Sequence, residues 1–95
     1  MYKDLDPVLH SQLRLAIVSM LVSSEKIEFT QIKEETKAAA GNISIQIKKL
    51  QEVGYIKVEK TFKNNYPKTL LSITDKGVKA FESYVNDLKK YINPQ

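Results

Sequence analysis

Residues 30–77 read TQIKEETKAAAGNISIQIKKLQEVGYIKVEKTFKNNYPKTLLSITDKG and contain most of the structural signals of the chain. Residues 30–36 suit a short helix, because they lack glycine and proline and carry helix-favouring charged residues. After a lysine and three alanines, residues 41–54 suit a second helix, which Gly54 closes in a left-handed conformation. The sequence therefore predicts two successive helices joined by a short connection.

A hairpin is predicted directly after the second helix. Residues 55–60 and 68–73 are candidate strands, because apolar and polar side chains alternate along the first of them. The turn between them is expected at residues 63–67, where Asn64-Asn65 tolerates positive φ. Pro67 indicates that the return strand starts after it or runs on an edge, because proline cannot donate to a strand ladder. The predicted order is helix, helix, hairpin.

The helix expected around residues 42–53 divides into two faces at 100° per residue. One face is apolar and should be buried, with Val53 near its edge: Ile43, Ile47 and Leu50. Ser44 and Gln46 flank that stripe. The opposite face should point to solvent and carries Asn42, Ile45, Lys48, Lys49 and Glu52.

A further helix is predicted before this stretch. Asp6-Pro7 resembles an N-cap followed by proline at the first helical position. The helix should end near Ser23-Ser24. Its expected core stripe has three- and four-residue spacing and consists of Leu9, Leu13, Ala16, Ile17, Met20 and Leu21.

Two more elements complete the expected fold. Residues 27–29 form a short extended segment, a candidate third strand beside the hairpin, and Thr30 is the expected N-cap of the next helix. Thr74, or Asp75 beside it, should cap a final helix. Its wide apolar stripe comprises Val78, Phe81, Val85, Leu88 and Ile92, joined by Tyr84 and Tyr91. The predicted fold class is mainly α with a small antiparallel β-hairpin, an α+β domain.

Composition argues against catalysis and against metal chemistry. The 95 residues suit one domain, and the absence of cysteine excludes disulfides and thiolate metal sites. His10 is the only imidazole, and the sequence nominates no partner for it. The three glycines form no phosphate-binding loop. We therefore expect no enzyme activity, no catalytic residue, no metal and no cofactor.

The sequence also carries no targeting or membrane signal. The N-terminus has Asp4 and Asp6 where a signal peptide needs basic residues and an apolar run. The longest apolar run, residues 15–22, contains Ser19 and is far shorter than the roughly 20 residues that span a bilayer. The expected location is the cytoplasm, without membrane attachment.

Positive charge is concentrated in the second helix and the hairpin. Residues 37–76 contain eight lysines against Glu52, Glu59 and Asp75, a net charge of +5. The rest of the chain has seven bases and eight acids, a net charge of −1. Lysines on a hairpin alone can serve to protect its edge from aggregation. Their coincidence with the preceding helix favours a nucleic-acid partner.

The chain resembles the small stand-alone winged helix-turn-helix regulators of bacteria and archaea, relatives of the MarR and ArsR groups. The resemblance rests on residues 5–15, 41–44, 48–56, 60–62, 67–69 and 71–77, and their order extends over nearly the whole chain. It implies a homodimeric transcription regulator that binds double-stranded DNA. In such a regulator the helix at residues 42–53 enters the major groove, and a wing at residues 60–69 lies over the adjacent backbone or minor groove.

The resemblance also implies one domain, residues 1–95, with four parts. They are the N-terminal helix and short strand at residues 1–29, the helix-turn-helix at 30–54, the wing hairpin at 55–73 and the C-terminal helix at 74–95. The terminal parts would build the dimer.

Two features depart from the pattern of these regulators. Many relatives carry a basic or polar residue where this chain has Ile45, and often histidine where it has Gln46. The wing tip often includes arginine, but here the only arginine is Arg14, in the first helix. Because arginine is the commonest reader of guanine, the usual guanine contact is not expected.

The candidate DNA-binding residues fall into two groups. In and before the second helix they are Ala39, Ala40, Asn42, Ser44, Ile45, Gln46, Lys48 and Lys49; on the wing they are Lys60, Lys63, Asn64, Asn65, Tyr66 and Lys68. The lysines would neutralise phosphates, and Gln46 would pair with adenine. Ile45, Ala39 or Ala40 would contact a thymine methyl group, and Tyr66 would stack on or hydrogen-bond to the backbone or simply be exposed.

Ile45 leaves a second function open. Instead of a thymine methyl it could mark a surface for a protein partner, or the helix could be rotated so that Ile45 is partly buried. The alternative to a DNA-binding regulator is therefore a winged-helix protein-interaction module whose recognition face, around Ile45, binds a protein.

The apolar stripes at the two ends of the chain predict a homodimer, although ordinary core packing would also use them. The expected interface comprises Leu5, Val8, Leu9, Phe81, Tyr84, Val85, Leu88, Tyr91 and Ile92. Related regulators can hold a small-molecule effector between such helices, but the sequence names no ligand. A two-fold dimer would set its recognition helices about 34 to 36 Å apart and favour a pseudo-palindromic operator.

Overall fold

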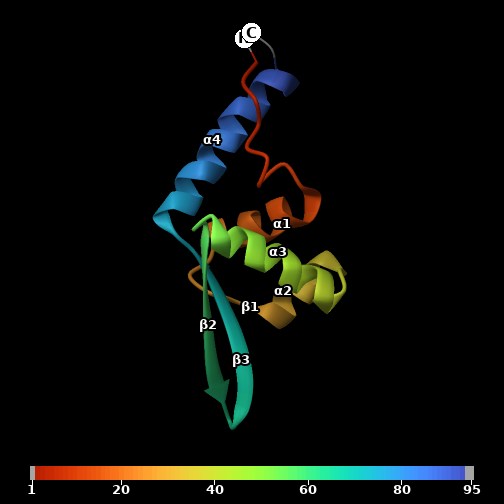
Figure 1. The fold of residues 1–95 in the computed structure, drawn as a ribbon, viewed down its shortest axis with the longest axis vertical. Helices are drawn as coiled ribbons and strands as arrows, with labels where there is room; N and C mark the ends of the chain where they lie inside the picture. The colour runs from red at the N-terminus through yellow and green to blue at the C-terminus, as the bar shows by residue number, and fades with distance from the viewer. Residues whose placement is uncertain (1, 94–95) are drawn as a thin grey trace.

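The structure, a computed structural model, describes residues 2–93. In chain order its elements are α1 (Gln12–Val22), β1 (Ile27–Glu28), α2 (Phe29–Thr36), α3 (Ala40–Glu52), β2 (Ile56–Lys63), β3 (Tyr66–Ile73) and α4 (Asp75–Ile92). The molecule is elongated, with extents of 54 × 25 × 21 Å. Figure 1 shows α4 and the N-terminal segment at one end, α1, α2 and α3 in the middle, and the hairpin at the other end. These elements confirm the predicted α+β fold class.

The core lies where α1, α2 and α3 meet the base of the sheet. The side chains without solvent-exposed area come from every layer of this body: Leu9, Ile17, Val18, Leu21, Ile32, Ile43, Leu50 and Leu71. Burying each such side chain contributes about 1.5 to 3 kcal/mol of stability. Ile47 is also buried, so the predicted inward stripe of α3 is confirmed.

The sheet has the strand order β1-β3-β2, and both pairs are antiparallel. Ile27 pairs with Leu71 and Glu28 with Leu70, which confirms the third strand beside the hairpin. Phe29 was predicted to extend that strand but instead begins α2.

The hairpin is longer and its turn tighter than the predicted turn at residues 63–67. Pairing continues out to Lys63 and Tyr66, and only Asn64 and Asn65 form the turn, with φ values of 52° and 66°. Such a two-residue turn matches the right-handed twist of paired strands. Pro67 lies inside β3, opposite Phe62, beyond the two residues that pair with β1. Its missing N–H therefore falls on an open edge, because the pair next to a two-residue turn exchanges hydrogen bonds and the following pair does not.

The first helix starts later than predicted. Ser11 is its N-cap residue, and α1 begins at Gln12. Asp6-Pro7 instead forms a separate turn, in which Asp6 Oδ1 accepts a hydrogen bond from Val8 N at 2.8 Å and Asp6 O accepts one from His10 N at 2.8 Å. The prediction failed because an aspartate that bonds the backbone two residues ahead can form a turn as readily as a helix cap.

The start of α2 was also predicted two residues too late. Glu28, not Thr30, is the N-cap residue, and its N–H donates to Gln31 Oε1 at 3.1 Å. Because Glu28 is the last residue paired in β1, the strand ladder determines where the chain turns into the helix. The glutamine three residues ahead then satisfies the free N–H.

The junction between α3, the sheet and α4 formed as predicted. Gly54 has φ of 80°, which ends α3 in the left-handed region. Thr74 caps α4 by accepting from Gly77 N at 3.0 Å, and its hydroxyl donates to Gly54 O at 2.6 Å. The same side chain therefore connects the ends of three elements.

The N-terminal segment lies along α4 (Figure 1). Tyr91 donates its hydroxyl to Lys3 O at 2.8 Å, and the rings of Tyr2 and Tyr91 lie 4.9 Å apart. Nearer the core, Tyr55 donates to Asp6 Oδ2 at 2.6 Å. Burial, followed by this hydrogen bond to a carboxylate, raises the pKa of Tyr55 to about 12. Among residues 2–93, no helix has the length and apolar character needed to cross a membrane.

Candidate nucleic-acid interface

The outward face of α3 is built as the sequence indicated. Asn42, Ser44, Lys48 and Lys49 are exposed, and the Ile45 side chain is 56% exposed. The exposure of Ile45 rules out the rotated helix, since Ile43 and Ile47 on either side of it are buried. An isoleucine that contributes nothing to the core therefore lies among polar and basic side chains.

The N-terminus of α3 is made of small residues. Ala39 is the N-cap residue, exposed and without a side-chain cap, and Ala40 is half-buried at the first helical position. No side chain of this end covers the free backbone N–H groups of the first turn, which favour negatively charged groups. A phosphate or a base edge can therefore approach this end closely.

Gln46 is held by an arginine that the sequence-based prediction left out of the site. Arg14 Nη1 donates to Gln46 Oε1 at 2.5 Å, and Arg14 Nε donates to Val8 O at 2.6 Å. Gln46 Nε2 in turn donates to Asn42 Oδ1 at 2.9 Å. Both the oxygen and the nitrogen of the Gln46 amide are thus hydrogen-bonded within the chain. To contact adenine, Gln46 would have to break its hydrogen bonds to Arg14 and Asn42. Because 32 positions separate Arg14 from Gln46, no local pattern signals the contact.

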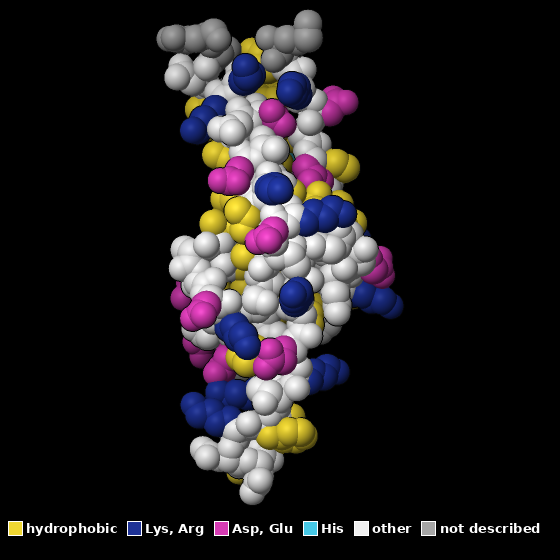
Figure 2. Space-filling view, turned by 90° about the vertical axis from the view of Figure 1, so that its left-hand side faces the viewer, with side chains coloured by type: hydrophobic (Ala, Val, Ile, Leu, Met, Phe, Trp, Pro, Cys, Tyr) yellow, Lys and Arg dark blue, Asp and Glu magenta, His cyan; other side chains and the backbone are white. Residues whose placement is uncertain are grey.

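The exposed part of the wing carries lysine and aromatic side chains. Five of its predicted DNA-binding residues are exposed: Lys60, Lys63, Asn64, Asn65 and Tyr66. Figure 2 shows Lys or Arg and hydrophobic side chains at this end of the molecule, whereas the acidic side chains visible in that view lie on the body and around α4. The outer part of the wing, residues 60–69, thus carries lysines and no acidic residue.

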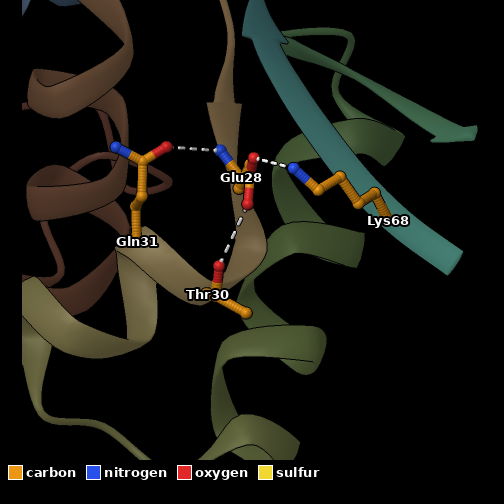
Figure 3. A network of polar contacts seen from close by, with 4 residues as sticks. All are labelled: Glu28, Thr30, Gln31 and Lys68. Carbon is orange, nitrogen blue, oxygen red and sulfur yellow. Dashed lines mark hydrogen bonds and ion pairs between the residues drawn. The ribbon is translucent and has the colours of Figure 1, made fainter. Parts of the chain in front are cut away.

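Lys68 differs from the other candidate lysines of the wing. Its Nζ forms an ion pair with Glu28 Oε1, and the two side chains are only 24% and 34% exposed. Thr30 also donates its hydroxyl to Glu28 Oε2 at 3.3 Å, so one carboxylate joins the start of α2 to β3 (Figure 3). The hydrogen bond from Lys68 is the main cause that lowers the pKa of Glu28. Lys68 is therefore neutralised inside the chain.

His10, the only histidine, makes a structural contact. His10 Nδ1 lies 3.1 Å from the hydroxyl of Tyr84, which is buried. Within residues 2–93, no group of three or more His, Cys, Asp or Glu side chains is placed to hold a metal ion.

The predicted dimer residues divide by exposure. Leu9 and Tyr84 are 0% and 4% exposed, so the single chain already buries them and they offer no free surface. Tyr91 and Ile92 are 47% and 74% exposed, and the others are half-buried: Leu5, Val8, Phe81, Val85 and Leu88. An apolar groove of about 380 Å³ runs between α1 and α4, with Leu15, Ala16, Phe81, Val85 and Leu88 among its lining residues.

The comparisons with known proteins agree with this architecture. The family model described as "Winged helix DNA-binding domain" matches residues 13–92. An uncharacterized protein of Methanocaldococcus jannaschii is 32% identical over 81 residues, which cover 85% of this chain and 88% of that protein.

Solved structures show the same fold. The transcriptional regulator homologue of Pyrococcus horikoshii OT3 aligns with a TM-score of 0.84 and 29% identity, over 90% of this chain and 85% of that one. Bacillus subtilis PadR, solved in complex with operator DNA, aligns with a TM-score of 0.70 and 21% identity, over 79% of this chain and 48% of PadR.

Proposed function

The chain belongs to the winged helix DNA-binding domain family, and on that premise we propose that it is a dimeric transcription regulator that binds specific sequences of double-stranded DNA. The fold is that of winged helix DNA-binding transcriptional regulators. Neither the family description nor the similar structures named above describe an enzyme. The observation that carries the proposal is the outward face of α3, exposed and basic while the opposite face is buried in the core.

In this proposal α3 enters the major groove. Lys48 and Lys49 neutralise phosphates beside the groove, and Asn42, Ser44 and Ile45 face the base edges. Ile45 suits a thymine methyl group, which is the apolar feature of the major groove. Gln46 is a conditional reader, because it must first release Arg14 and Asn42.

The wing supplies the second contact in this proposal. Lys60 and Lys63 are exposed, and we place them on the phosphates of the adjacent backbone. Gly54 and the short connection after α3 join the recognition helix directly to β2, the first strand of the wing. Lys68 is assigned to the junction with α2 and not to the DNA.

The proposal includes a two-fold dimer of single domains, built by α4 and the N-terminal segment. The exposed Tyr91 and Ile92, together with the groove between α1 and α4, support this arrangement. The same groove is the place for an effector, should the regulator use one. A protein-binding recognition face is less favoured, because PadR, which shares this fold, binds operator DNA.

Selection from a pool of genomic DNA fragments tests sequence specificity. The full chain is immobilised, bound fragments are recovered at moderate salt, and their sequences are compared with those of the starting pool. The proposal predicts enrichment of a pseudo-palindromic motif. The matched control is a chain with Ile45→Ser, which keeps the charge of α3 but removes the apolar contact and should relax the enriched motif. Recovery of a pool with no enriched sequence would reject specific regulation.

A further inference from the structure

Two aromatic side chains at the tip of the wing, Phe62 and Tyr66, are exposed to solvent and take no part in the core. Phe62 is 74% exposed and Tyr66 is 73% exposed, at either side of the Asn64-Asn65 turn. Phe62 lies beside its exposed partner Pro67 on one face of the hairpin, and Tyr66 lies on the other face. The neighbouring apolar side chains of Phe62 and Pro67 are therefore the candidate contact.

Phe62 lies on the same face of the hairpin as the side chains that pack on the core. Ile56 and Val58 pair with Ile73 and Leu71 at the base of the hairpin, where they pack into or against the core. Because side chains alternate along a strand, Lys60 and Phe62 lie on the same face of β2 as Ile56 and Val58, further towards the turn. Figure 1 shows the hairpin projecting beyond the helices, and Phe62 and its partner Pro67 are both exposed.

The tip is built to hold its shape. Strand pairing continues to Lys63 and Tyr66, and a two-residue turn with both φ values positive closes the hairpin. Pro67 adds a fixed φ beside Phe62. A hairpin that is already paired to its end has less conformational entropy to lose on binding than a disordered loop of the same length.

The charge around the tip indicates which partner it fits. Residues 60–74 contain three lysines and no acidic residue. Glu28 neutralises Lys68, which leaves Lys60 and Lys63 exposed beside the aromatic rings. A second copy of this tip would bring like charges together, whereas a duplex offers phosphates for the lysines and base steps for the rings.

We propose that the wing tip is an apolar wedge that enters the minor groove and kinks the duplex, with Phe62 backed by Pro67 as the inserted group. Lys60 and Lys63 bind the phosphates that border the groove, and Tyr66, on the opposite face of the hairpin, contacts the sugar wall. This inference rests on the proposed DNA-binding function and adds a deformation of the DNA. Minor-groove proteins that insert such wedges kink the duplex by about 20 to 90°.

The test measures bending directly. A duplex of about 30 base pairs, rich in TA steps because these kink most easily, carries a donor dye at one end and an acceptor dye at the other. Energy transfer is recorded on binding of the full chain, of Phe62→Ser and of Phe62→Leu at low salt. The wild type should raise energy transfer. Phe62→Ser should bind with an unchanged salt dependence, since no charge is altered, yet leave the duplex near its free length. Phe62→Leu should keep most of the bend.

The outcomes separate the wedge from DNA binding itself. A wild type that binds the duplex and leaves it straight overturns the wedge while the proposed function stands, and so does a Phe62→Ser variant that bends it fully. Absence of binding to any duplex overturns both. Melting temperatures of the three proteins check that an exposed residue has been changed without loss of the fold.

Discussion

At the scale of single residues, two glycines in helices have opposite environments. A Cβ atom at Gly77, in the first turn of α4, would lie 2.2 Å from the backbone oxygen of Tyr55. A Cβ atom at Gly41, near the start of α3, would meet nothing within 4 Å. Gly77 is therefore needed for α4 to approach the chain at Tyr55, whereas Gly41 is not required by packing.

Gly77→Ala should destabilise the protein by about 1 to 3 kcal/mol, because the overlap forces α4 away from Tyr55. Gly41→Ala should instead stabilise it by roughly 0.5 to 1 kcal/mol, because glycine is an unfavourable residue in a helix. Urea unfolding of both variants beside the wild type measures the two changes. Equal effects would mean that α4 does not approach Tyr55 as closely as described.

Tyr55 should make stability depend on alkaline pH. Its phenol keeps its proton in the folded chain up to about pH 12, against an ordinary value of 10.0, so the unfolded state ionises first as pH rises. The stabilisation is complete below pH 10.0 and is lost on approach to about pH 12.

Tyr55→Phe provides the matched comparison. It should be less stable than the wild type by about 1 kcal/mol at neutral pH, because it loses the hydrogen bond to Asp6. The difference in unfolding free energy between the two proteins should shrink between pH 10.0 and about pH 12. Both proteins have the same lysines, so the comparison cancels their contribution. A difference in unfolding free energy that stays constant up to about pH 12 would contradict the raised pKa of Tyr55.

At the scale of elements, the sequence did not reveal the ion pair that connects α2 to the wing. Glu28 both caps α2 and pairs with Lys68 of β3, 40 positions away (Figure 3). The ion pair joins the start of α2 to the outer half of the hairpin, where Lys68 pairs with Thr61. In the proposed complex Lys68 therefore positions the wing, and the exposed Lys63 near the tip binds phosphate.

The salt dependence of DNA binding distinguishes these two roles. Lys63→Ala should reduce the slope of log affinity against log salt by about 1, as expected when one phosphate contact is lost. Lys68→Ala should weaken binding at each salt concentration but leave the slope nearly unchanged. Glu28→Gln, which releases the charge of Lys68, should steepen the slope. A loss of slope in Lys68→Ala equal to that in Lys63→Ala would show that Lys68 contacts phosphate directly.

The elements differ in how far local sequence determines them. The two faces of α3 follow from its 3.6-residue period, so Ile43, Ile47 and Leu50 were predictable. The starts of α1 and α2 were not, because Asp6 satisfies a local turn and the pairing of Glu28 with Leu70 sets the start of α2. Two contacts join segments that are distant in the sequence: the hydrogen bond from Arg14 to Gln46 and the ion pair of Lys68 with Glu28. Local residue spacing does not predict such contacts.

At the scale of the whole molecule, the end of α4 has apolar side chains that the single chain does not bury. Ile92 is 74% exposed and Tyr91 is 47% exposed, whereas Tyr84, two turns earlier, is buried. The helix thus changes from packing on its own core to presenting a free surface. We expect this surface to pair with a second copy.

Ile92→Asp should convert a dimer into a monomer with little change in the stability of the single chain, because the residue is exposed there. Ile92→Leu is the control that keeps the apolar surface and should remain dimeric. Sedimentation at tens of micromolar distinguishes the two forms. A wild-type chain that sediments as a monomer under these conditions would contradict the dimer and the pseudo-palindromic operator that depends on it.

The salt dependence of binding to double-stranded DNA tests the central claim most directly. If the lysines of two recognition helices and two wings neutralise about 6 to 10 phosphates, affinity should fall by roughly 10³ to 10⁵ between 50 and 200 mM salt. Lys48→Ala combined with Lys49→Ala should flatten that dependence while the fold remains intact, since both residues are exposed. Absence of binding to duplex DNA at 50 mM salt, a condition that favours phosphate contacts, would contradict the account.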